Sequence, residues 1–237
     1  MNSNVTMSEV QNDLLKSLLA ARSHDSCALI CRSIQTVLNK HPQALSQWSI
    51  EATLSTTTKL AKEALVPGSP VALASLCEVL LVVTRKHRLR LEGHYHVLVS
   101  ALQSLLRLLI ANQASSMQNQ KDDANLFSRL IHAICEPTVG AVSHSKQGSR
   151  LDSATDAAKR SAGQHMYLLL MEYVKLQLEN RIPRSTLDVL ESPMNSIFDI
   201  TPPETRKILN DAMDASSRAI LREMFKRYTK FGKWAGV

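Results

Sequence analysis

Aromatic residues, glycine and proline are scarce in this chain of 237 residues. Only 4% of the residues are aromatic, and there are seven glycines and eight prolines. Both counts of turn-forming residues are below what a chain of this length usually carries. A β-sandwich needs many tight turns, so the composition argues against a loop-dense β fold.

Long apolar runs are also missing. The longest unbroken run of large aliphatic residues has five members, Val79 to Val83, whereas a membrane-spanning helix needs about 20. The first ten residues carry neither a basic nor an apolar segment, so we expect no secretory signal. Four cysteines, at positions 27, 31, 77 and 135, do not form a disulfide framework in a chain of this length. With 44% hydrophobic residues, the chain is expected to be a soluble, folded, intracellular protein.

Motifs of known chemistry are missing as well. The sequence holds no glycine-rich phosphate loop and no Gly-x-Ser-x-Gly element. His94 and His96 have no accompanying carboxylates, and Cys27 and Cys31 have no second Cys or His pair at zinc-finger spacing. We predict no catalytic residue, no cofactor, no metal site and no small-molecule substrate, and we expect the cysteines to be buried core thiols.

Helical periodicity recurs along the chain, and strand-like alternation is almost absent. Cys27, Cys31, Ile34 and Leu38, for example, fall at spacings of four, three and four, which places them on one helix face. The predicted helices span 9–21, 25–39, 49–65, 70–85, 91–112, 124–135, 154–180, 184–191 and 202–231. The last of these is expected to be capped by Thr201, with Pro202 and Glu204 in its first turn.

These helices predict an all-α fold, an irregular helical array that resembles HEAT or armadillo stacking. The polar stretch 112–123 is interpreted as a loop, and Pro183 and Pro193 as brackets around a short helix followed by a separate piece, 194–200. Residues 1–237 are expected to form a single domain, with a possible subdomain division near 140–153, where the chain is rich in Ser, Gly and Lys.

Positive charge collects near the end of the chain. Lys and Arg outnumber Asp and Glu by 28 to 21 overall, and six of the 28 basic residues fall between 218 and 233, against one acidic residue. On a helical wheel its apolar residues, Leu209, Met213, Ile220, Met224, Tyr228 and Phe231 among them, fall on one side. Arg227 points toward that side and is expected to pair with Glu223. The opposite side forms a basic ridge, a candidate contact for RNA or a partner, made of Arg218, Arg222, Lys226 and Lys230, with Lys233 just beyond. The alternative is a solvated helix face.

A second basic cluster lies between two apolar helices. Its candidate RNA-binding or partner-binding residues are Arg85, Lys86, Arg88 and Arg90, with His87 among them. Cations at a helix end are also attracted by the carbonyl dipole, so a structural explanation is open too. The aromatics beyond the last helix are expected to fold back onto the core, with base stacking as the alternative.

Three segments resemble the Urb/Npa family of nucleolar pre-ribosomal RNA processing proteins. The run Ser216 to Trp234 (SSRAILREMFKRYTKFGKW) carries the family's motif positions Arg218, Phe225, Tyr228, Lys230, Phe231, Gly232, Lys233 and Trp234. The helix Gly93 to Leu109 and the stretch Tyr173 to Ile200 are similar to the family's upstream segments. One departure is Leu221-Arg222, where the family pattern has an aromatic–basic pair.

The resemblance implies that this chain is the C-terminal piece of a larger nucleolar protein of the nucleus. It implies a role in early large-subunit (pre-60S) assembly alongside a DEAD-box helicase and other assembly factors, without catalysis. In this interpretation Phe225, Tyr228, Phe231, Gly232 and Trp234 are structural.

The leading hypothesis is therefore a non-enzymatic scaffold that binds assembly-factor proteins and pre-rRNA. The alternative is a protein-binding helical module without RNA contact, which would take an amphipathic peptide in a groove between helices.

Overall fold

The computed structural model describes residues 6–66, 69–112, 117–138 and 151–231. In this part of the chain the regular structure is helical and includes no strand, which confirms the all-α array. The chain divides into two compact units, Met1–Asn112 and Gln113–Val237. The predicted division near 140–153 falls largely on residues outside the described ones and stays a prediction.

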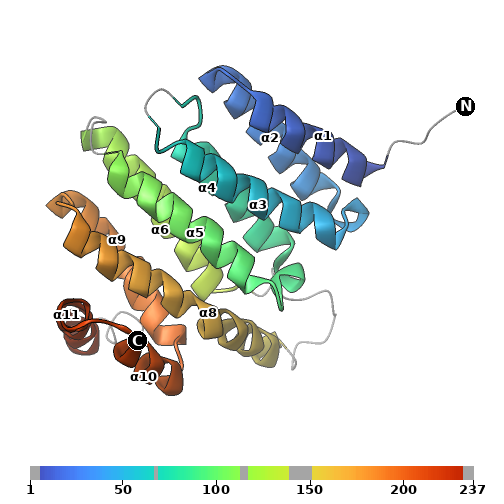
Figure 1. Ribbon diagram of the computed structural model, residues 1–237. Helices are drawn as coiled ribbons and strands as arrows, with labels where there is room; N and C mark the ends of the chain where they lie inside the picture. The colour runs from blue at the N-terminus through green and yellow to red at the C-terminus, as the bar shows by residue number, and fades with distance from the viewer. Residues whose placement is uncertain (1–5, 67–68, 113–116, 139–150, 232–237) are drawn as a thin grey trace, which may run out of the picture. The chain divides into compact units, whose positions relative to one another are not determined.

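The first unit stacks helices in two layers (Figure 1). One layer holds α1, α3 and α5 as successive neighbours, and the other holds α2 against α4. Pairing of α1 with α2 and of α3 with α4 makes two helical hairpins, the unit from which HEAT-like arrays are built. The helices are α1 (Met7–Ala20), α2 (His24–Lys40), α3 (Gln47–Glu63), α4 (Leu73–Lys86) and α5 (Tyr95–Ala111), with 3₁₀ turns at Pro42–Ala44 and Arg88–Leu91.

Local sequence signals explain where these helices begin and what they bury. Thr6 and Glu9 form a capping box at α1, with Glu9 N–H donating to Thr6 Oγ1 at 3.2 Å and Thr6 N–H donating to Glu9 Oε2 at 2.7 Å. The predicted stripe of α2 is confirmed, because its buried residues are Cys27, Cys31, Ile34 and Leu38. All four cysteines of the chain are buried, and burial raises the pKa of Cys31 to about 12.

The second unit holds α6 (Met117–Cys135), α8 (Leu151–Glu179), α9 (Arg184–Ile200), α10 (Pro203–Ala212) and α11 (Ala215–Phe231). The helix α9 packs on both α6 and α8, and α10 and α11 both pack on α8 (Figure 1). Gly163 in α8 marks a close approach. A Cβ atom there would lie 1.9 Å from the carbonyl oxygen of Ile200, at the end of α9.

The predicted loop at 112–123 is wrong over its second half, since α6 begins at Met117. The polar residues of this stretch suit a solvent-facing first turn of a helix. Gln118 Nε2 donates to Asp122 Oδ1 at 3.1 Å, a bond between residues four apart that supports helical rather than loop structure.

The predicted break at Pro193 is also wrong, because α9 runs through this proline from Arg184 to Ile200. Proline removes one backbone hydrogen bond from a helix interior. Here the helix is held by its packing on α6 and α8, in which Leu190, Pro193, Met194 and Ile197 are buried. Tertiary burial outweighs the local cost of the proline.

The predicted continuous helix from 202 to 231 is two helices, α10 and α11, separated at Met213 and Asp214. Thr201 is not its cap, since its hydroxyl donates to the carbonyl of Ile197 at 2.6 Å and Pro202 stands at the N-cap without a side-chain bond. Because the break at Met213 and Asp214 changes the orientation of α11 relative to α10, the apolar face predicted for a single helix from 202 to 231 does not apply. Ser216 is exposed, and the buried residues of α11 are Ser217, Leu221 and Tyr228.

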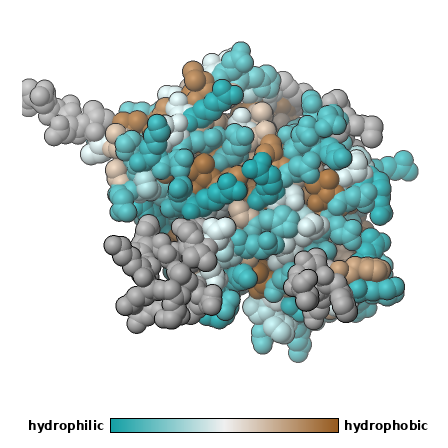
Figure 2. Space-filling view, turned by 180° about the vertical axis from the view of Figure 1, so that it is seen from behind, coloured by the Kyte–Doolittle hydropathy of each residue, from teal (hydrophilic) through white to brown (hydrophobic). Residues whose placement is uncertain are grey.

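Hydrophobic residues on the surface are scattered rather than continuous over the face shown in Figure 2, where hydrophilic residues separate them. Single exposed apolar residues of this kind are normal on folded proteins and mark no site by themselves. The helices in the described ranges include none that is long and apolar enough to span a membrane.

Candidate partner-binding surface on helices α9, α10 and α11

Helix α11 owes its start to Asp214. Its carboxylate accepts the backbone N–H of Ser217 at 2.8 Å and the Ser217 hydroxyl at 3.1 Å. These bonds satisfy a donor that the helix itself leaves without a partner. The same hydrogen bonds hold the pKa of Asp214 below its usual range. The sequence Asp214-Ala-Ser-Ser is therefore the signal that a new helix begins here.

Two aromatic residues anchor α11 to α9. The Phe225 ring lies 5.5 Å from Phe198 and 5.7 Å from Tyr228, measured between centroids. The Tyr228 hydroxyl donates to the carboxylate of Asp199 on α9. Burial and this neighbouring carboxylate raise the pKa of Tyr228 to about 12. Phe225 and Tyr228, two motif residues of the family resemblance, thus lie at the packed side of α11.

The predicted basic ridge lies on the open side of α11. Arg222, Lys226 and Lys230 are exposed, and Arg218 is half-buried. Each is four residues from the next, so the four side chains form one row along the helix. Arg222, Lys226 and Lys230 form no ion pair with other residues in the described ranges. We name Arg218, Arg222, Lys226 and Lys230 the α11 ridge.

Other cations near the end of the chain have different surroundings. Arg227 pairs with Glu223, as predicted, at 3.5 Å between Nε and Oε1. It is exposed rather than directed into the apolar side, because the buried face of α11 centres on Leu221 and Tyr228. The prediction that Phe231 packs on the core is wrong, since this ring is 66% exposed and the Lys230 ammonium lies 5.0 Å from its centroid. Lys233, Gly232 and Trp234 lie outside the described residues.

An apolar groove of about 380 Å³ runs beside the α11 ridge. Its hydrophobic walls come from three helices, and every charged residue in its lining is basic. The lining residues are Phe198 of α9, Arg206, Leu209 and Asn210 of α10, and Leu221, Arg222, Phe225, Lys226 and Thr229 of α11. Sequence reasoning missed this groove because it exists only if α10 and α11 are separate helices.

Arg206 is the one groove cation that is committed to the fold. Its Nε donates to the carbonyl of Thr201 and its Nη2 to the carbonyl of Phe198, both at 3.0 Å. These bonds satisfy carbonyls at the end of α9. The guanidinium carbon lies 5.5 Å from the centroid of Phe225, over that ring. Arg206 therefore fixes one wall of the groove, whereas Arg222 and Lys226 remain open to a ligand.

The basic cluster at 85–90 divides into outer and inner residues. Arg85 and Lys86 are exposed in the last turn of α4, where they complement its carbonyl end. Arg88 is buried at 3% exposure. Arg90 donates from Nη1 to the carbonyl of Leu45. Only Arg85 and Lys86 thus keep an open position for a partner.

His87 belongs to the inner part of this cluster. It is 2% exposed, and its Nε2 lies 2.9 Å from the carbonyl oxygen of Leu38. Burial lowers the pKa of His87, with a smaller contribution in the same direction from the Arg90 charge, while the bond to Leu38 opposes the shift. The neutral ring is therefore the form that the fold favours.

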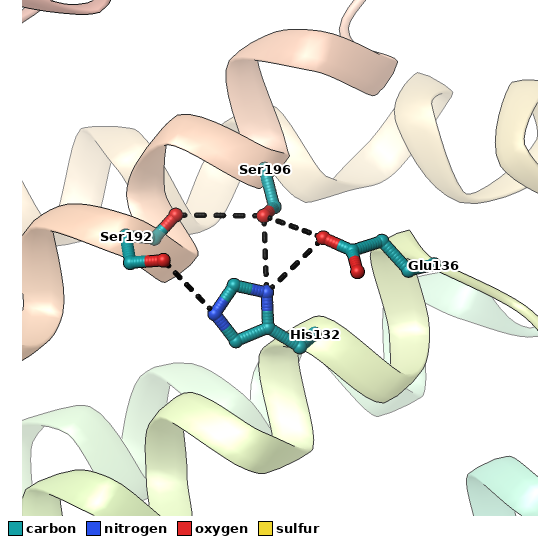
Figure 3. Close-up of polar contacts among 4 residues, drawn as sticks. All are labelled: His132, Glu136, Ser192 and Ser196. Atoms are coloured by element: carbon teal, nitrogen blue, oxygen red, sulfur yellow. Dashed lines mark hydrogen bonds and ion pairs between the residues drawn. The ribbon is translucent and has the colours of Figure 1, made fainter. Parts of the chain in front are cut away.

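A cluster of Ser192, Ser196, His132 and Glu136 joins α9 to the end of α6 (Figure 3). The hydroxyl of Ser192 lies 3.2 Å from His132 Nε2, and Glu136 Oε1 lies 3.2 Å from His132 Nδ1. Ser196 donates to Glu136 at 3.0 Å and also contacts His132 Nδ1 at 3.1 Å. The order serine, histidine, carboxylate is that of a nucleophilic triad. However, the residue after Ser192 is Pro193, which has no N–H to stabilise an oxyanion. The geometry is suited to fixing the register between α6 and α9.

Metal binding has no support in the described part of the chain, where no three His, Cys, Asp or Glu residues are placed to hold one ion.

The comparison with protein families gives one match. A model of the Urb2/Npa2 family matches residues 28–237, a range that extends from within α2 beyond the end of α11. Neither a curated protein nor a solved structure matches the chain. The family acts in ribosome biogenesis and is not known for enzymes. The resemblance carried by the helix at Gly93 to Leu109, the stretch before α10 and the Lys-Phe-Gly-Lys-Trp ending is confirmed, and the chain belongs to the Urb2/Npa2 family.

Proposed function

We propose that this chain is a non-catalytic helical scaffold for assembly of the large ribosomal subunit in the nucleolus. In this role it holds assembly-factor proteins, a DEAD-box helicase among them, through the α11 ridge and the adjoining groove. Family membership supports the process. The observation that supports the surface is the exposure of Arg222 and Lys226 at the edge of an apolar groove.

The combination of charge and apolar lining favours a protein partner. Protein interfaces have an apolar core surrounded by a polar rim. Phe198, Leu209, Leu221 and Phe225 would supply the core, and the α11 ridge would supply the rim. RNA phosphates would contact the basic residues of the α11 ridge but would not fill the apolar groove.

Contact with pre-rRNA is a second candidate, favoured by the open row of Arg222, Lys226 and Lys230. A triple alanine variant at these positions tests it through the salt dependence of RNA affinity. If each side chain neutralises one phosphate of a single strand, the slope of log affinity against log salt falls by about 0.7 per residue removed. Unchanged affinity and slope would show that the ridge does not contact phosphates.

The scaffold role is tested in cells by reversing charge on α11. We expect a chain with Arg222→Glu and Lys226→Glu to leave the gradient fractions that contain large-subunit precursors, and unprocessed precursor rRNA to accumulate. A matched control carries Arg22→Glu and Arg32→Glu, which reverse two exposed cations outside both basic clusters. If the α11 variant stays in the precursor fractions with normal rRNA processing, the proposed function is wrong.

A further inference from the structure

We infer that the groove between α10 and α11 binds a short acidic helix of a partner protein, with one or two large apolar side chains inserted in the groove and carboxylates on Arg222 and Lys226. This inference rests on the proposed function and names the chemistry of its partner.

The size and lining of the groove suit apolar side chains. Its volume of about 380 Å³ falls within the range of about 300–1,000 Å³ that is typical of ligand pockets. Leu209 is 1% exposed and Leu221 is 6% exposed, so both belong to the wall rather than to a movable rim. An inserted leucine or phenylalanine side chain would cover this wall and remove it from water.

The charge around the groove selects an acidic partner. No carboxylate is among the lining residues, while Arg206, Arg222 and Lys226 are all cationic. Arg206 already donates to the carbonyls of Thr201 and Phe198. Arg222 and Lys226 lie one helical turn apart and form no ion pair within the described ranges. Two carboxylates one turn apart on a partner helix would match that spacing.

The aromatic rings of the groove do not offer a platform for a nucleic-acid base. The Phe225 ring lies beneath the Arg206 guanidinium and makes contacts with Phe198 and Tyr228. The Thr229 hydroxyl donates to the carbonyl of Lys226 at 2.9 Å, within its own helix. Single-stranded RNA is held by stacking on open rings. A helix with its apolar face in a groove is the recognition mode that fits these walls.

The test measures fluorescence anisotropy of a synthetic labelled helix of about 16 residues bound to the full chain. The probe has leucines at spacings of three and four on one face and glutamates beside them. Two control peptides replace the glutamates by lysine or the leucines by alanine, and a labelled single-stranded oligouridine is the RNA probe. We expect binding of the acidic leucine peptide about tenfold tighter than of either control peptide.

Two variants locate the binding on this groove. Thr229→Trp fills the groove and is paired with Gln164→Trp, which places the same ring on an exposed position of α8. Arg222→Glu with Lys226→Glu removes the rim charge and is paired with Arg22→Glu and Arg32→Glu, which reverse two exposed cations outside both basic clusters. We expect each groove variant to weaken binding about tenfold, and each control to change it less than about twofold.

Several results would overturn the inference. Equal binding of the acidic and basic peptides would show that charge does not select the partner. Oligouridine that binds more tightly than the peptides, with an affinity that Thr229→Trp leaves unchanged, would favour RNA as the ligand. Self-association of the chain that Thr229→Trp abolishes would make a second copy the occupant of the groove. If the acidic leucine peptide bound only to a chain shortened to end at Phe231, the groove would be assigned to residues 232–237 of the same chain. If the acidic peptide binds selectively but the Arg222→Glu, Lys226→Glu chain stays with the large-subunit precursors in cells, only the proposed function is contradicted. If that chain leaves the precursors but the peptides bind without selectivity, only this inference is contradicted.

Discussion

The two basic clusters of this chain look alike in the sequence and differ in the structure. Between Arg85 and Arg90, one arginine is buried and another donates to the backbone of Leu45, so half of the cluster stabilises its own unit. On α11, three of the four ridge cations are exposed beside an apolar groove.

The difference follows from where each cluster stands in its helix. The 85–90 cluster spans the end of α4 and the 3₁₀ turn after it, where backbone carbonyls without helical partners attract cations inward. The α11 ridge repeats every four residues along a continuous helix, and of its four residues only Lys230 lies in the last turn, where carbonyls lack helical partners. The place of a basic run in its helix therefore decides how many of its side chains stay exposed and how many bond to the fold.

The largest expected effect is on the frame that holds the α11 ridge in place. Gly163→Ala should destabilise the chain by about 3 kcal/mol, because the new methyl group would meet the Ile200 carbonyl, which precedes α10. Urea unfolding gives the value, and Gln164→Ala, an exposed neighbour, is the control. A stability loss no greater than that of the control would show that α8 and α9 can separate at no cost.

The next effect separates the two clusters directly. Arg88→Ala should cost about 2 kcal/mol of unfolding free energy, since it removes the packing of a side chain that is only 3% exposed. Arg222→Ala should stay within about 0.5 kcal/mol of the unchanged chain, because its side chain is exposed. Equal losses in denaturant titrations would remove the distinction between an inner and an open cluster.

A pH effect should follow from His87. Its folded pKa lies below its ordinary value of 6.5, so the unfolded chain takes up a proton that the folded chain does not. The contribution of neutral His87 is complete above pH 6.5 and is lost as the pH falls from 6.5 toward the folded pKa. Unfolding free energies measured across this window should fall less steeply for His87→Gln. Parallel profiles for the two chains would contradict the assignment.

The smallest expected effect is at the start of α11. Asp214→Ala should lower the melting temperature, whereas Asp214→Asn should retain most of it, because asparagine also caps helices. The folded pKa of Asp214 is below its ordinary 3.8, so its contribution is present above that value and is lost as the pH falls through the folded pKa. Equal melting temperatures of the alanine and asparagine variants in calorimetry would show that Asp214 does not cap α11.

Sequence patterns correctly predicted those features that depend on the residue spacing within a single helix. The buried stripe of Cys27, Cys31, Ile34 and Leu38 and the open row on α11 both follow from a spacing of three or four. The predicted helix break at Pro193 is wrong, because the packing of α9 on two neighbouring helices outweighs the tendency of proline to end a helix. The prediction of one helix through Met213 overlooked Asp214 as a cap.

The groove could not be predicted because its lining comes from three helices. Phe198, Leu209 and Leu221 lie on three successive helices, and only the packing of these helices brings the three side chains to one cavity. Leu221 is buried in the groove wall at 6% exposure. Nor does helical periodicity show that Arg88 is buried while Arg85 is exposed, because Arg88 lies in a 3₁₀ turn after α4, where the α-helical spacing no longer holds.

The most direct test of the account compares what touches each cluster in cells. A photoreactive amino acid is placed at Lys230 on the α11 ridge or at Lys86 in the other cluster, both of which are exposed. After irradiation and nuclease digestion, the proteins crosslinked at each position are identified by mass spectrometry. The account predicts that position 230 captures acidic segments of assembly-factor proteins and that position 86 does not. Protein crosslinks at position 86 alone, or only RNA at position 230, would contradict it.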